Sequence, residues 1–86
     1  MGYRGIPHRS CSHAESQARL RQVSHQDIRD TLDEPDTDVP SSHARNRRVL
    51  RKRFSATFEV GIVIEPPNEE HSEILVVTAW ACRPGD

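Results

Sequence analysis

The stretch Glu73-Ile-Leu-Val-Val-Thr-Ala-Trp-Ala81 is the longest nearly charge-free run in this chain of 86 residues. It is rich in β-branched side chains and lies between polar turns, which predicts a strand buried on both faces at the centre of a sheet. Thr78 lies near its middle, and Trp80 follows two residues later. Regular alternation would place Thr78 on one face with Ile74, Val76 and Trp80, and we expect that face to look across at a helix.

Two further strands are predicted before this one. Residues 47–54 alternate imperfectly and carry a basic face, which is typical of an edge strand. Residues 57–65 alternate cleanly, and the connections on either side are short enough for hairpins. The three segments predict an antiparallel β-meander of three strands, or of four. The apolar face of the cleaner strand consists of Phe58, Val60, Ile62 and Ile64.

Two helices are predicted ahead of the strands. A hydroxyl at Ser12 and Glu15 three residues later form a capping-box pattern, so a helix is expected over residues 13–22. Ser24 and Asp27 repeat the pattern and predict a second helix over residues 25–32. The expected fold class is therefore α+β, with two N-terminal helices packed on one face of the meander.

The length of the chain indicates a single domain with a thin core. Residues 1–11 show no periodicity and are expected to form an irregular lead-in. Residues 12–82 form the predicted α+β domain, within which residues 36–46 are a polar loop. Residues 83–86 are a short C-terminal tail.

Charge is strongly patterned although the net charge is only −1. Residues 45–53 hold six basic side chains, and residues 27–38 hold six acidic ones. Most of the basic residues are arginines, whose planar guanidinium binds phosphate oxygens in pairs. Three interpretations stay open for the basic stretch. It forms a phosphate-binding surface, its charges discourage edge-to-edge aggregation, or it pairs with the acidic stretch of the same chain.

Several function classes have no support in the sequence. There is no glycine-rich phosphate loop, no dinucleotide fingerprint and no metal-ligand spacing among the histidines and cysteines, so no cofactor or metal is expected. Cys11 and Cys82 are expected to be free thiols, with a disulfide between the two ends as the alternative. No run suits a signal peptide or a membrane span, so the expected location is the cytoplasm and no membrane partner is expected.

Several short motifs follow one another along the chain: His13-Ala14, Arg21-x-Val23-Ser24, Asp27-Ile28, Leu32, Pro35-Asp36 and Val76-Val77-Thr78. Their order resembles the domain-of-unknown-function family 4258. The resemblance extends from about Ser12 to Trp80, and in one position the chain departs from it, since Gln17 stands where the family often has Arg. The family is similar to the barnase–EndoU–colicin–RelE group of small toxins and ribonucleases, with N-terminal helices and an antiparallel sheet.

This resemblance implies a toxin-like protein that cleaves or binds RNA without a metal, with RNA and a cognate antitoxin as partners. Such cleavage needs an acid and a base, for which histidine is suited near neutral pH, and cations to stabilise the charged phosphorane. His13 is the candidate acid or base, Arg21 a phosphate contact and Thr78 a positioning group. The candidate RNA-binding residues on the basic strand are Arg48, Arg51 and Arg53.

Each assignment has a structural alternative. His13 is equally consistent with a water-exposed residue in a capping turn, and Thr78 with an ordinary β-branched strand residue. The rival function is a non-catalytic protein-interaction or dimerisation module, with a homo-oligomer as its product. The helices favour this rival because their few large apolar residues would cover the sheet poorly; these are Leu20, Val23, Ile28 and Leu32.

Overall fold

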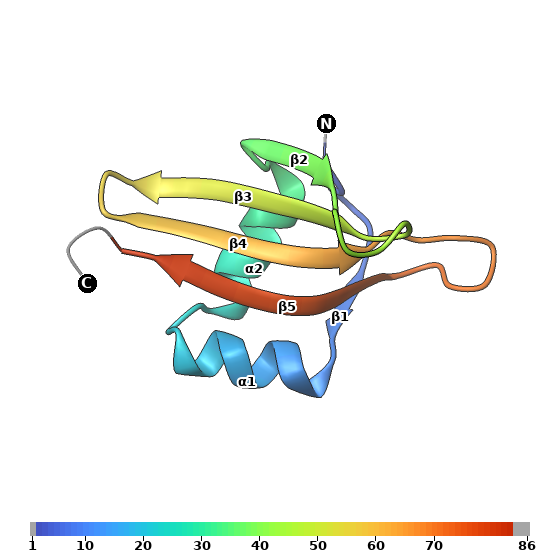
Figure 1. Cartoon of the computed structure of the whole chain (residues 1–86), viewed down its shortest axis with the longest axis horizontal. Coiled ribbons are helices and arrows are strands. Elements are labelled where there is room, and N and C mark those ends of the chain that lie inside the picture. The colour runs from blue at the N-terminus through green and yellow to red at the C-terminus, as the bar shows by residue number, and fades with distance from the viewer. Residues whose placement is uncertain (1, 84–86) are drawn as a thin grey trace.

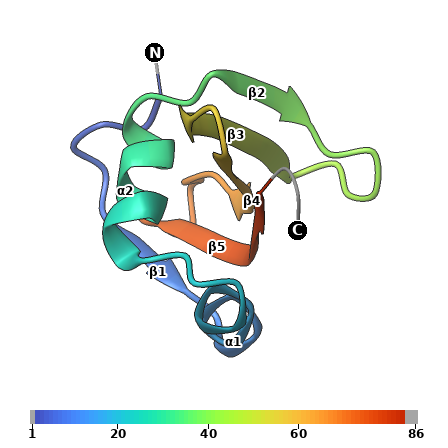
Figure 2. The ribbon, with the colours of Figure 1, turned by 90° about the vertical axis from the view of Figure 1, so that its left-hand side faces the viewer.

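The chain folds as an α+β domain with a five-stranded mixed sheet, in which one helix crosses a face of the sheet and the other lies alongside its last strand (Figures 1 and 2). The computed structural model describes residues 2–83. The strands lie in the order β1-β5-β4-β3-β2, with β1 parallel to β5 and every other pair antiparallel. The elements are β1 (His8–Ser10), α1 (Ser12–Leu20), α2 (His25–Asp33), β2 (Thr37–Pro40), β3 (Arg48–Ser55), β4 (Phe58–Glu65) and β5 (Ile74–Cys82).

The predicted meander is confirmed as β3, β4 and β5, but the sheet is larger than predicted. Strand β1 lies within the stretch expected to be an irregular lead-in, and β2 lies within the expected polar loop. Both are short edge strands, joined to their neighbours by main-chain hydrogen bonds rather than by an apolar face. Their side chains therefore show no alternation that could have revealed them. Of the predicted tail, only Arg83 lies within the described residues.

Helix α2 begins as predicted, and α1 differs at both ends. Ser24 and Asp27 form the predicted capping box, with reciprocal hydrogen bonds of 3.0 Å. The N-cap of α1 is Cys11 instead of Ser12, and its Sγ accepts from the Ala14 amide at 3.5 Å. The helix ends at Leu20, two residues earlier than predicted, since the backbone turns left-handed at Gln22 with a φ of 57°.

The hydrophobic core lies between the helices and the sheet. Ala14 and Ala18 are the buried residues of α1, and their small side chains let the helix approach β5 closely. Leu20, the only large apolar residue of α1, is instead 71% exposed. The other core residues are Val23, Ile28, Leu32, Leu50, Val60, Ile62, Ile64, Ile74, Val76 and Ala79.

The prediction that Thr78 faces a helix is wrong, because a β-bulge interrupts β5. Ile64 pairs with Val76, but the preceding residue of β4, Val63, pairs with Thr78, so Val77 is an extra residue in β5. One extra residue inverts the alternation of everything that follows it. Ile74 and Val76 therefore face the helices, whereas Thr78 and Trp80 lie on the opposite face.

Candidate functional site

The face of the sheet opposite the helices is the candidate site, and we call it the open face. In the end-on view of Figure 2, α2 lies on the other side of the sheet and α1 lies beside β5 at its edge. Apolar, aromatic and charged side chains are mixed on this face, and most are only partly buried. Residues paired across β2, β3, β4 and β5 share a face. The pairing places Val39, Val49, Arg51, Arg53, Glu59, Gly61, Val63, Glu65, Leu75, Thr78 and Trp80 on the open face.

Trp80 is the centre of this face, and Gly61 determines how it lies. Gly61 pairs with Trp80 on one side and with Arg51 on the other. A Cβ atom at residue 61 would lie only 2.2 Å from the indole carbons Cε2 and Cζ2. The indole therefore occupies the space that a side chain on β4 would fill, and the Arg51 guanidinium carbon lies 5.9 Å from the ring centroid. Glycine within a strand marks such a close approach.

Nearby carboxylates neutralise the positive charges of Arg51 and Arg53 only weakly. Within residues 2–83, no carboxylate oxygen lies within 4.0 Å of the Arg51 guanidinium. Arg53 and Glu59 approach only to 3.9 Å, at the limit of an ion pair. Ion pairs this exposed contribute little to stability. Both guanidinium groups can therefore bind an external anion without losing a strong ion pair within the protein.

A row of aliphatic side chains crosses the open face next to Trp80. Val39 pairs with Val49, which pairs in turn with Val63 and then Thr78. Val39 is 49% exposed on the outermost strand. The row adds apolar surface that a ligand or a second protein can cover.

The predicted catalytic residues belong to two elements, α1 and β5. His13 and Arg21 belong to α1, where Arg21 is the C-cap, and both residues are exposed. Thr78 lies on the open face of β5, the strand that α1 runs beside. Arg51 and Arg53 share the open face with Thr78, so these three residues do lie on one surface.

Arg48 lies apart from the other predicted phosphate-binding residues. It pairs with Ile64 and therefore lies on the helical side of the sheet. Its Nε donates to Asp38 at 2.5 Å, and this hydrogen bond raises the pKa of Arg48. The interpretation that the basic stretch pairs with the acidic stretch is thus confirmed at Arg48, though not at Arg51.

A small cavity of about 80 Å³ opens at one end of the open face, near the β4–β5 turn. Arg9 and Glu73 form an ion pair of 2.9 Å in its wall. Its remaining lining includes Glu65, His71 and Leu75. Sequence reasoning missed this cavity because Arg9 is far along the chain from the other lining residues, which lie within residues 65–75. The role of Gly61 could have been inferred, since a glycine inside an apolar strand is unusual.

Comparison with protein-family models, with curated proteins and with solved structures finds no match to this chain. The resemblance to family 4258 therefore depends on the motifs alone. Among residues 2–83, no cluster of three or more histidine, cysteine or acidic side chains is arranged to hold a metal ion. In the same range neither helix has the length and apolar character needed to cross a bilayer. Cys11 and Cys82 are free thiols.

Proposed function

We propose that this protein is a small, toxin-like RNA-binding domain that holds single-stranded RNA on its open face. The observation that carries the proposal is the Trp80 indole lying across Gly61 beside Arg51. Single-stranded RNA is bound by aromatic rings that stack on bases and by cations that follow the backbone. The open face offers both kinds of group on one surface that the helices leave uncovered.

Single-stranded RNA fits this face better than a duplex. Bases in a duplex are stacked on one another and cannot stack on a side chain, whereas unpaired bases can. The net charge of −1 also provides no general attraction for a densely charged duplex. Binding must therefore come from local contacts, with a base on Trp80 and phosphates near Arg51 and Arg53.

The test is fluorescence anisotropy with an end-labelled single-stranded RNA of about ten nucleotides and the matching duplex. We expect the single strand to bind more tightly, with affinity that falls as salt rises. Arg51→Gln should reduce the salt slope by about 0.7, which corresponds to one lost phosphate contact. Arg19→Gln is the matched control, because Arg19 is exposed on α1 and its loss changes the net charge equally. Equal effects of both variants would contradict the proposal.

Trp80 is tested with two substitutions that differ in aromaticity. Trp80→Phe keeps a ring that stacks, whereas Trp80→Leu keeps apolar volume without one. Loss of base stacking costs about 1–3 kcal/mol, so Trp80→Leu should weaken binding about fivefold to 150-fold. Trp80→Phe should retain most of the affinity. If both variants bind RNA like the original protein, the open face is not the binding surface.

The resemblance also implies that the protein cleaves RNA without a metal. The same labelled RNA can test for this cleavage. His13 lies on α1, and Thr78 lies on the open face of β5. Incubation with a chelator followed by gel electrophoresis detects metal-independent cleavage. Products that disappear in His13→Ala, at unchanged stability, would support a catalytic His13. Intact RNA in the presence of the original protein would leave binding as the function.

The aliphatic row on the open face favours one second candidate, a dimerisation or protein-interaction module such as an antitoxin-binding domain. Partly exposed valines on three adjacent strands suit packing against a second protein surface. Light scattering over a range of concentrations separates the candidates. A dimer that Val63→Asp converts to a monomer, without RNA binding in either form, would favour the interaction module.

A further inference from the structure

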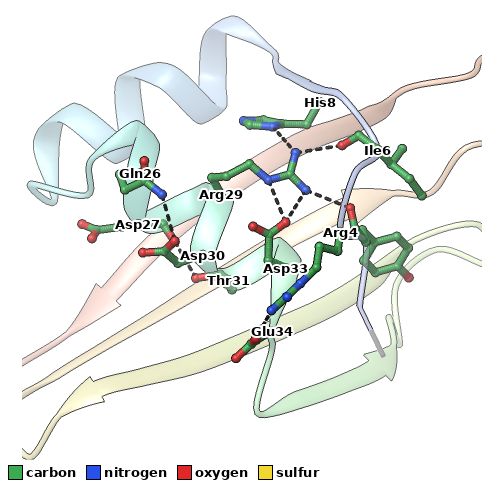
Figure 3. A network of polar contacts seen from close by, with 11 residues as sticks. Arg4, Ile6, His8, Gln26, Asp27, Arg29, Asp30, Thr31, Asp33 and Glu34 are labelled. Atoms are coloured by element: carbon green, nitrogen blue, oxygen red, sulfur yellow. Dashed lines mark hydrogen bonds and ion pairs between the residues drawn. The ribbon is translucent and has the colours of Figure 1, made fainter.

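Arg29 of α2 forms hydrogen bonds that attach the N-terminal segment, residues 3–8, to α2 (Figure 3). Its Nη1 donates to the carbonyl of Ile6 and its Nη2 to the carbonyl of Tyr3, each at 2.8 Å. Asp33, one turn further along α2, accepts from Nε at 2.9 Å and orients the guanidinium. Charged hydrogen bonds that are partly buried are stronger than exposed ones. Arg29 therefore holds the chain that leads into β1.

His8, the first residue of β1, completes this network. Its Nδ1 lies 3.1 Å from Arg29 Nη1. Arginine can only donate hydrogen bonds, so Nδ1 must accept and the ring must be neutral, with its proton on Nε2. A proton on Nδ1 would place two donors and two positive charges at this distance.

The surroundings of His8 oppose its protonation. Burial lowers the pKa of His8, and the charge of Arg29 and then that of His25 lower it further, while Asp33 acts in the opposite direction. All three charged groups belong to α2. On β5, the register partner of His8 is Ile74, which carries no charge.

Strand β1 connects this network to the opposite side of the sheet. Successive residues of a strand point to opposite faces, so His8 faces α2 while Arg9 lies on the side of the open face. Arg9 pairs with Glu73 in the wall of the cavity. The strand itself has three residues, and the Ile74 amide donates to the Pro7 carbonyl at 2.9 Å where the pairing begins. A strand so short opens without unfolding the rest of the sheet.

We propose that His8 is an acid-sensitive switch: its protonation breaks the contact with Arg29, weakens the docking of residues 3–10 and opens β1 from the edge of β5. Opening withdraws Arg9 from Glu73 and so removes one wall of the cavity at the end of the open face. The switch is independent of RNA binding, since it requires only the Arg29 network and the pairing of β1 with β5.

The direction of the pH effect follows from the lowered pKa of His8. When β1 is open, His8 titrates near its ordinary value of 6.5, and when β1 is docked it titrates lower. Above pH 6.5, His8 is neutral in both states and the docking of β1 is at its most stable. As the pH falls through the lowered value, the open state binds the additional proton and docking weakens. One proton changes the opening equilibrium by at most about tenfold per pH unit between the two values.

Hydrogen exchange of the Ile74 amide measures this opening. After correction for the intrinsic exchange rate, its protection factor should fall as the pH drops below 6.5, by no more than about tenfold per unit. His8→Asn should abolish the pH dependence, because the asparagine Oδ1 can accept from Arg29 and does not titrate. His43→Gln is the matched control, since His43 lies in an exposed loop and its loss should leave the pH dependence intact.

The opposite results would overturn the switch. These are a protection factor that does not change with pH in the original protein, or a pH dependence that persists in His8→Asn. Should His8→Asn not fold, the ring of His8 can be titrated by NMR in the original protein. Its midpoint must lie below 6.5, the ordinary value for a histidine, and coincide with the chemical-shift change of the Ile74 amide; a midpoint of 6.5 or higher would refute the proposal.

Discussion

Gly61→Ala tests most directly how the open face is built. A Cβ atom at this position would lie 2.2 Å from the Trp80 indole. Carbon atoms in contact settle at about 3.5–4.0 Å, so the ring must retreat by about 1.3–1.8 Å. Overpacking of this kind costs about 1–3 kcal/mol. Alanine also lowers the conformational entropy of the unfolded chain, which stabilises the folded protein by about 0.4–1 kcal/mol. We therefore expect a net loss of about 1–2 kcal/mol in the free energy of unfolding.

Urea denaturation followed by circular dichroism measures this loss. Trp80 is the only tryptophan, so its fluorescence reports the position of the ring without interference. Emission from the folded Gly61→Ala protein should shift to longer wavelength as the indole moves towards water. The displaced ring should also weaken RNA binding if the open face is the binding surface.

A double-mutant cycle with Trp80→Ala isolates the cause. Without the indole, the added methyl group of Gly61→Ala meets no obstacle from Trp80, and the substitution should become neutral or stabilising. The coupling energy between the two positions should be about 1–3 kcal/mol. A Gly61→Ala protein at least as stable as the original would refute the reasoning. So would a loss of stability that is the same with and without Trp80.

Substitutions at three further positions test the local structure, each by urea denaturation. Ser24→Ala removes the hydroxyl that accepts from the Asp27 amide and should cost about 1 kcal/mol; no change would mean that the capping box contributes nothing. Ile62→Ala leaves a cavity at a fully buried position of β4 and should cost about 2–5 kcal/mol; a cost below 1 kcal/mol would contradict the position of the core. Cys11→Ser should retain stability because a hydroxyl caps a helix well, whereas Cys11→Ala should lose about 0.5–2 kcal/mol. Equal stability of the two Cys11 variants would exclude a capping role for this side chain.

Local signals were sufficient for the long elements of the fold. The alternation of Phe58, Val60, Ile62 and Ile64 predicted β4, because a strand with one buried face must repeat every two residues. The Ser24 capping box predicted the start of α2, because its hydrogen bonds join residues only three positions apart. In both cases the interactions that stabilise the element lie within the element itself or its nearest neighbours in the sequence.

The candidate site could be predicted only in part. Arg51 and Arg53 were assigned to one strand face, and the structure places them together on the open face with Thr78 and Trp80. The association with His13 was expected from the assumption that this face lies under a helix. The bulge at Val77 reverses that orientation. No local sequence pattern predicts the bulge, because it arises from the pairing of β4 with β5.

The amino-acid sequence by itself determined the α+β class, the order of the two helices and the three long strands, and the basic face of β3. Only the tertiary structure determined that β1 and β2 form, that the Cys11 thiol caps α1, and on which side of the sheet Trp80 lies. The physical reason is the same for the edge strands and for Trp80. Main-chain pairing between distant segments needs no side-chain pattern, and a shift of one residue in that pairing exchanges the two faces of a strand.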